Sequence, residues 1–170
     1  MNYDEARQYI EDGDTIAIIT PHNWIGKITQ FFTRREYTHT GIAVWIDGGL
    51  YLAELNGGGN HLTPLSHWRD ADFDVCQMPI GLVNIRESIF DILRDPIEYA
   101  YEGFLAAGAR VFFKIKQGIH WRTRLICVGF CVAVYERSGW GKRDRVIAPF
   151  ELVDQLKIKI KVRRSDAGHR

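Results

Sequence analysis

The chain has 170 residues, and its 46% hydrophobic and 25% charged content is typical of a globular protein with a core of its own. Its 22 lysines and arginines nearly balance its 21 aspartates and glutamates. The net charge of +1 therefore gives no reason to expect a nucleic acid or another polyanion as partner. We expect a single domain over residues 1–170, with a core over about 12–155 and a loose tail over 163–170.

The sequence shows neither a signal peptide nor a membrane span. The residues after Met1 are polar and acidic and lack the apolar core of a signal peptide. The longest apolar run, residues 125–134, is much shorter than the ~20 residues that a membrane helix needs. Three cysteines cannot all pair within the chain. These features predict a cytoplasmic protein with reduced thiols, while release by phage lysis or virion association stays open.

The first half of the chain combines a short helix with several strands. Residues 3–10 have an amphipathic pattern with Tyr3, Ala6 and Ile10 on one side. Runs rich in β-branched residues predict strands, and Asp47-Gly48-Gly49 predicts a hairpin turn. The expected strands lie over residues 14–20, 40–46, 50–55 and 73–77, with a brief strand over 61–63 and a helix over 24–32.

The second half is mainly helical. Ile85, Ile89, Ile92 and Leu93 form one helical stripe. The remaining expected elements are a helix from Pro96 to Gly108, a helix over about 126–139, a short helix opened by Pro149 and an edge strand over 156–162. This order of elements predicts an α+β fold.

One apolar segment carries two of the three cysteines. Its apolar residues fill every side of a helix, which predicts a buried helix that starts near Ile126. Cys127 would then lie in the first turn, where unpaired N–H groups and the helix dipole stabilise a thiolate. Cys131 lies one turn deeper and lacks this help. Cys127 is therefore the candidate nucleophile, although a cysteine in an apolar helix is more often an inert core residue.

A cysteine nucleophile needs a base and a group that orients the base. His39 opens the second predicted strand, and Glu54 is an isolated carboxylate in the apolar third strand. Pairing around the predicted turn puts Glu54 three residues out of register with His39, so contact would require a bulge or a longer loop. Taken singly, a strand histidine is more often structural, and a strand glutamate more often faces water.

Several short motifs follow one another along the chain. They are Gly13-Asp14-Thr15-Ile16, Tyr37-Thr38-His39-Thr40-Gly41-Ile42, Leu52-Ala53-Glu54-Leu55, Pro64-Leu65, Leu125-Ile126-Cys127-Val128-Gly129-Phe130 with Tyr135-Glu136, and Pro149-Phe150-Glu151-Leu152. In this order they resemble the circularly permuted NlpC-type papain-like cysteine peptidases, the YiiX-like branch, over about residues 12–155. That branch has its histidine first, a polar residue second and its cysteine last. The resemblance implies a permuted papain-like α+β fold in which an antiparallel sheet packs against the helix that carries the cysteine.

The resemblance also implies a thiol hydrolase that cleaves a peptide or isopeptide amide, for example in a cell-wall peptide. Cys127 would be the nucleophile, His39 the base and Glu54 the orienting residue, and no cofactor is expected. Family members commonly have a small polar residue directly after the cysteine, whereas this chain has Val128. The alternatives are a lipid acyltransferase or esterase that uses the same three residues, and a non-catalytic binding module that keeps the fold.

The sequence offers further candidate site residues besides these three. His22 and Tyr37 are candidate substrate contacts. His61 and His67 lack the cysteine or carboxylate spacing of zinc sites, so no metal is expected. The basic and aromatic segment 110–124 is either a solvated lid over the cleft or a surface that contacts a membrane or an anionic polymer.

Overall fold

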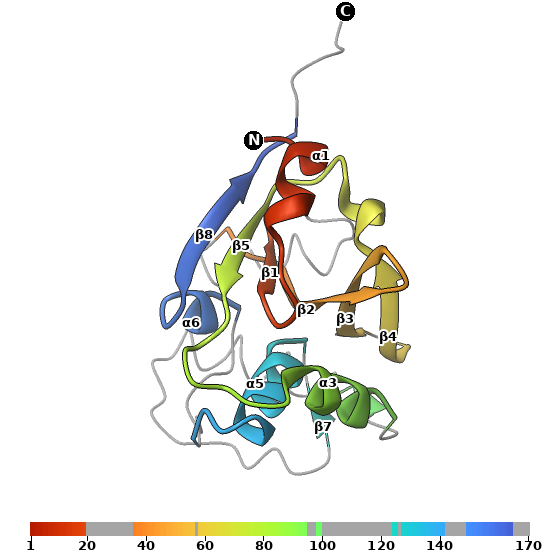
Figure 1. The fold of residues 1–170 in the computed structure, drawn as a ribbon, viewed down its shortest axis with the longest axis vertical. Coiled ribbons are helices and arrows are strands. Elements are labelled where there is room, and N and C mark those ends of the chain that lie inside the picture. Colours follow the sequence, from red (N-terminus) through yellow and green to blue (C-terminus); the bar gives the residue numbers. More distant parts are fainter. Residues whose placement is uncertain are drawn as a thin grey trace, which may run out of the picture.

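The computed structural model describes residues 1–19, 36–56, 58–94, 98–99, 124–125, 127–141 and 149–164. Its centre is a six-stranded antiparallel sheet in the order β4-β3-β2-β1-β5-β8 (Figure 1). The strands are β1 (Thr15–Ile18), β2 (His39–Ile46), β3 (Gly49–Asn56), β4 (Gly59–Pro64), β5 (Phe73–Gln77) and β8 (Lys157–Val162). The helices are α1 (Tyr3–Ala6), α3 (Ile85–Arg94), α5 (Cys127–Arg137) and α6 (Pro149–Val153), with 3-10 helices η1 (Arg7–Tyr9) and η2 (Leu65–Trp68). The α+β class predicted from the sequence is confirmed.

Helices cover both faces of the sheet. α1 and η2 pack on one face, in a core cluster that includes Ile16, Ala43 and Leu52. α3 and α5 pack on the other face, against Ile42 and Ala53, and lie side by side below the sheet in Figure 1. Because successive strand side chains point to opposite faces, neighbouring residues of one strand enter different clusters. We call these the α1 face and the α5 face.

Most predicted elements are confirmed within one or two residues, including β5, α3, α5 and the edge position of β8. The brief strand expected over 61–63 is longer, because all of β4 pairs with β3. Predictions for residues 24–32 and for most of 96–124 lie outside the described residues.

One predicted element is wrong in the part that can be compared. A helix from Pro96 was expected to include Tyr99, but Glu98 and Tyr99 form β6 and pair in parallel with β7 (Arg124–Leu125). The preference of proline for a first helical turn is local and weak, and pairing with a distant strand overrides it.

The end of β8 is held by polar contacts. The Arg163 guanidinium lies 2.7 Å from Oδ1 of the buried Asp74, and the Arg164 N–H donates to Asp72 Oδ1 over 2.8 Å. Residues 163 and 164 of the predicted tail are therefore tied to the sheet, and residues 165–170 lie outside the described part of the chain. The single-domain organisation stays a prediction.

The hairpin between β2 and β3 has a tighter turn than the sequence analysis assumed. Two residues form it, Asp47 with φ 47° and Gly48 with φ 78°, and positive φ at both positions is what a type I′ turn needs. The predicted register was wrong by one residue for this reason. A shift of one residue exchanges the faces of a strand, so Glu54 lies on the α1 face, together with His39.

Pairing between β2 and β3 ends before either strand does. The last pair is Ile42 with Ala53. Beyond it, β2 continues to His39 while paired only with β1, and β3 continues to Asn56 while paired only with β4. The two halves of the sheet therefore separate at this point, which we call the sheet split.

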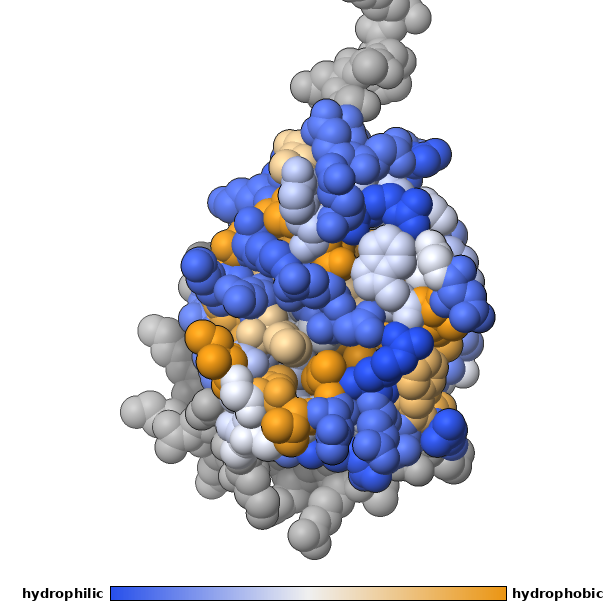
Figure 2. Space-filling model, viewed as in Figure 1, coloured by the Kyte–Doolittle hydropathy of each residue, from blue (hydrophilic) through white to orange (hydrophobic). Residues whose placement is uncertain are grey.

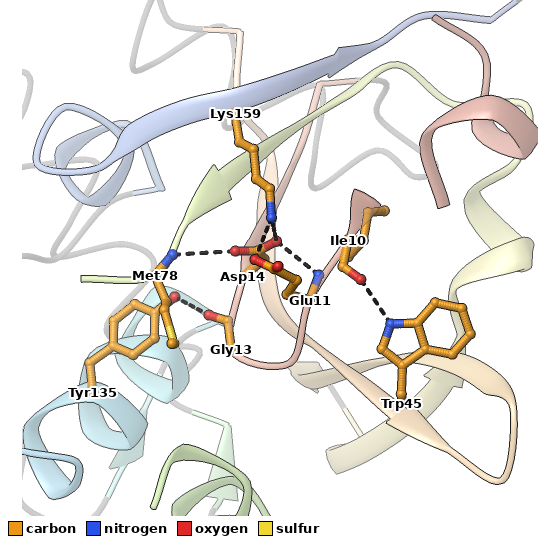
Figure 3. A network of polar contacts seen from close by, with 8 residues as sticks. All are labelled: Ile10, Glu11, Gly13, Asp14, Trp45, Met78, Tyr135 and Lys159. Atoms are coloured by element: carbon orange, nitrogen blue, oxygen red, sulfur yellow. Dashed lines mark hydrogen bonds and ion pairs between the residues drawn. The ribbon is translucent and has the colours of Figure 1, made fainter. Parts of the chain in front are cut away.

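A buried tyrosine fixes α5 against the start of β1. The Tyr135 hydroxyl donates to the Gly13 carbonyl over 2.7 Å and lies 2.6 Å from Thr15 Oγ1. Figure 3 shows this contact beside the buried Asp14, which accepts the Glu11 N–H and binds the ammonium of Lys159 from β8. The motif around Gly13 is thus the point where helix, central strand and edge strand are joined.

Among the described residues, the two most exposed large apolar side chains lie in one loop. Ile80 and Val83, between β5 and α3, are 95% and 65% exposed. On the face shown in Figure 2, apolar residues emerge mostly in the lower half, among polar ones. None of the helices in the described ranges has the length and apolar character needed to cross a membrane.

Replacing Tyr135 by phenylalanine tests the junction with β1. The variant keeps the aromatic packing but leaves the Gly13 carbonyl without its tyrosine donor, so the free energy of unfolding should fall by about 1–3 kcal/mol. Urea denaturation measures the change. The matched control is Tyr9→Phe, whose side chain is 52% exposed and whose loss should be close to zero. Equal effects of the two variants would contradict this role.

Candidate active site

Cys127 is the first residue of α5 and lies at the sheet split. The following residues Val128, Phe130 and Cys131 pack into the core on the α5 face, which fixes the start of the helix against β2 and β3. Cys127 itself is only 7% exposed. Its position in the first helical turn is the one predicted from the flanking sequence.

His39 and Glu54 are joined on the α1 face. The His39 Nε2 atom lies 2.6 Å from Glu54 Oε2, and Glu54 is only 3% exposed. With the observed register the position opposite His39 is residue 56, so Glu54 is a diagonal neighbour on the same face. Gly41 lies two residues after His39 on β2, next to β3. A Cβ there would come within 2.8 Å of both the Leu52 side chain and the Ala53 carbonyl, so only glycine lets β3 approach this closely.

The sheet split lets Cys127 reach these two residues from the opposite face. α5 lies on the α5 face, whereas His39 and Glu54 lie on the α1 face, so an intact sheet would separate them. Where β3 no longer pairs with β2, the backbone N–H of Thr40 donates to the Cys127 sulfur, and His39 hydrogen-bonds to the same sulfur. Because Nε2 of His39 is occupied by Glu54, Nδ1 is the nitrogen left for Cys127.

The electrostatics favour a thiolate beside an imidazolium. Burial raises the pKa of Cys127, but the charge and hydrogen bond of His39 and the N–H groups of Thr40 and Val128 outweigh burial and lower that pKa below 9.0. Burial alone would lower the pKa of His39. The Cys127 charge and hydrogen bond, followed by those of Glu54, instead raise it from 6.5 to about 10. The contacts between the two residues therefore favour the charged form of each.

Glu54 is ionised in the same network. Burial raises its pKa, but the hydrogen bond and charge of His39, and then the hydroxyl of Thr63, lower it below its usual value. Thr63 Oγ1 donates to Glu54 Oε1 over 2.5 Å. Both carboxylate oxygens thus have a hydrogen-bond donor, as a buried carboxylate requires.

At the other two cysteines, burial dominates the thiol pKa. Burial raises the pKa of Cys131 far above its usual value and that of Cys76 to about 12. The Cys131 thiol donates to the Cys127 carbonyl, one helical turn earlier. A reactive thiolate is therefore favoured only at Cys127 among the three thiols.

Two residues near the site were missed by the sequence analysis. Trp68 stacks on the His39 ring, with centroids 6.1 Å apart and planes at 17°, and an indole face beside an imidazolium is a favourable contact. Thr63 is the second. The only signal for either was the Pro64-Leu65 motif between them, which says nothing about their side chains.

The predicted substrate contacts have different outcomes. His22 lies outside the described residues. Tyr37 is buried, and its hydroxyl donates to Asp74 Oδ2 over 2.8 Å. Burial, and then this hydrogen bond, raise the pKa of Tyr37. In this structure the Tyr37 hydroxyl thus binds an interior carboxylate, and a contact with substrate stays a prediction.

Comparisons with known proteins place the fold. No family model and no curated protein matches the chain. The structure is similar to the crystal structure of the metalloprotein YiiX from Escherichia coli O157:H7, with a TM-score of 0.56 and 21% identity, over 79% of this chain and 68% of that one. At this identity the likeness concerns the fold, which is YiiX-like.

Alkylation tests the charge state of Cys127. Iodoacetamide at pH 7 should modify Cys127 and leave Cys131 and Cys76 unmodified in the folded protein, as measured by peptide mass spectrometry. A lowered thiol pKa preserves the thiolate as the pH falls below 9.0, so His39→Ala should slow labelling at pH 7 roughly tenfold. Equal labelling of Cys127 and Cys131, insensitive to His39, would contradict the ion pair and favour a binding module.

Proposed function

We propose that the protein is a thiol hydrolase of the circularly permuted papain-like kind, which cleaves a peptide or isopeptide amide. The observation that carries the proposal is the continuous hydrogen-bonded chain Cys127–His39–Glu54, with the thiol pKa lowered and the imidazole pKa raised. A nucleophile, a base and an orienting carboxylate are the parts that such a reaction needs.

The YiiX-like fold and the order of the residues support the same assignment. Histidine, carboxylate and cysteine follow one another along this chain, which is the order of the permuted branch. The first two come from neighbouring strands and the third from the start of a helix on the opposite face. The fold similarity covers 79% of the chain, so it extends well beyond any one of these elements.

The reaction would proceed in two stages. The Cys127 thiolate attacks the amide carbonyl carbon and forms the C–S bond, and the carbonyl oxygen takes the negative charge. The N–H of Cys127 at the helix start is the proposed donor to that oxygen. As the C–N bond breaks, His39 gives its proton to the leaving amine, which leaves a thioacyl-enzyme. His39 then removes a proton from water as the water oxygen attacks the thioester carbonyl. The C–S bond breaks, which releases the carboxylic acid and restores the Cys127 thiolate beside a protonated His39.

Glu54 keeps its charge throughout. It fixes the orientation of the His39 ring and stabilises the imidazolium, without accepting its proton. Val128 follows the nucleophile, so no polar side chain is available at that position for the oxyanion, and backbone donors at the helix start are the proposed contacts.

A metal site does not fit the described residues. YiiX, the protein of similar fold, is a metalloprotein. In the described ranges, no three histidine, cysteine, aspartate or glutamate side chains are grouped to hold a metal ion. Within the Cys127 site, Glu54 is bound through both oxygens and His39 through Nε2. The remaining donor atoms, the Cys127 sulfur and Nδ1 of His39, contact each other, and they are two at most, against the three or so protein ligands typical of zinc.

Covalent trapping tests the proposal and identifies the substrate class. The protein is incubated with a cell-wall peptide digest or with a lipid extract, quenched with acid, and searched by mass spectrometry for an acyl adduct on Cys127. We expect an adduct on Cys127 from the cell-wall digest. Its mass should disappear when the thioester is reduced, and Cys127→Ala should form no adduct. An adduct from the lipid extract alone would instead assign a lipid acyltransferase or esterase. A protein with no adduct from either source, and with no labelling preference for Cys127, would be a binding module.

A further inference from the structure

Strand β4 lacks the buried apolar side chains that usually stabilise a strand in a sheet. None of its residues, Gly59–Pro64, is buried, so it contributes no fully buried apolar side chain. It nevertheless pairs with β3 from Tyr51 to Asn56. Its side chains contact other elements through hydrogen bonds: Asn60 donates to the Ile92 carbonyl, and Thr63 donates to Glu54.

The pairing with β4 is needed where β3 leaves β2. Beyond Ala53, β3 has no partner on the β2 side, and Glu54 pairs with His61 of β4. The backbone of Glu54 is therefore held by β4, and its carboxylate is held by a side chain of the same strand. β4 thus fixes both ends of the residue that contacts His39.

The hydrogen bond from Thr63 is one of two that hold the Glu54 carboxylate. Glu54 is 3% exposed, so water cannot replace a lost donor without opening the site. Oε2 accepts from His39, and Oε1 accepts from the Thr63 hydroxyl over 2.5 Å. A carboxylate only accepts when ionised, so both contacts stabilise the charged form and fix the plane of the carboxylate.

We propose that Thr63 is a positioning residue of the Cys127 site. Its hydroxyl keeps Glu54 ionised and aimed at Nε2 of His39, and through His39 it stabilises the Cys127 thiolate. The inference rests on the proposed function only in that Cys127 acts as a thiolate.

The test is the pH dependence of iodoacetamide alkylation at Cys127 in Thr63→Val. Valine keeps the shape of threonine and removes the hydroxyl, so Oε1 of Glu54 loses its donor. The midpoint of the alkylation profile should rise by about half to one pH unit, and the rate at pH 6.5 should fall about three- to tenfold. Thr63→Ser, which restores a hydroxyl, should return the profile to that of the unmodified protein. If valine at this position lowers the yield of folded protein, Thr63→Ala gives the same readout, because alanine removes the hydroxyl without putting a methyl group in its place.

The matched control is Thr38→Val. Thr38 lies beside His39, and its hydroxyl donates to the Ile18 carbonyl over 3.2 Å, so the variant loses one hydroxyl contact but none to Glu54. Its profile should be unchanged. An unchanged profile in Thr63→Val, or equal shifts in the two variants, would overturn the role of Thr63 while leaving the proposed function intact. An ordinary thiol profile in the unmodified protein would overturn both.

Discussion

The end of pairing between β2 and β3 is the constraint on which the candidate site depends. A helix on one face of a continuous sheet cannot contact side chains on the other face. Because the last β2–β3 pair is Ile42 with Ala53, the start of α5 enters the split and Cys127 reaches His39. The Thr40 N–H, freed from the ladder, becomes a donor to sulfur. The end of β2–β3 pairing leaves this backbone N–H without a partner in the sheet, and the N–H thereby becomes one of the donors of the site.

Two charges that burial opposes are stabilised together in this split. Burial acts against the Cys127 thiolate and against the His39 imidazolium, and it is the largest single influence on each pKa. The combined hydrogen bonds and mutual attraction outweigh it in both cases. Each charge favours the other, so the two residues titrate as a coupled pair. Glu54 and the Trp68 ring then stabilise the positive end.

Local patterns in the sequence predicted most of the helices and strands in the described part of the chain, but β6 and the register of the β2–β3 hairpin were predicted wrongly. The first turn of α5, the edge strand with alternating lysines and the candidates Cys127, His39 and Glu54 all follow from composition, caps and motif order. The sequence Asp47-Gly48-Gly49 fits either a two- or a three-residue turn, and that single residue decides whether Glu54 shares a face with His39. Thr63 and Trp68 could not be predicted, because their roles come from a strand and a 3-10 helix placed by that register.

The most direct measurement of the central claim is an NMR titration of the His39 ring in the full chain and in Cys127→Ala. A raised folded pKa means that the imidazolium persists as the pH rises, so His39 should stay protonated at pH 8 and lose its proton near pH 10. Removing the thiolate should move that titration to lower pH by more than one unit. A ring that titrates near 6.5 in both proteins would contradict the ion pair across the sheet split.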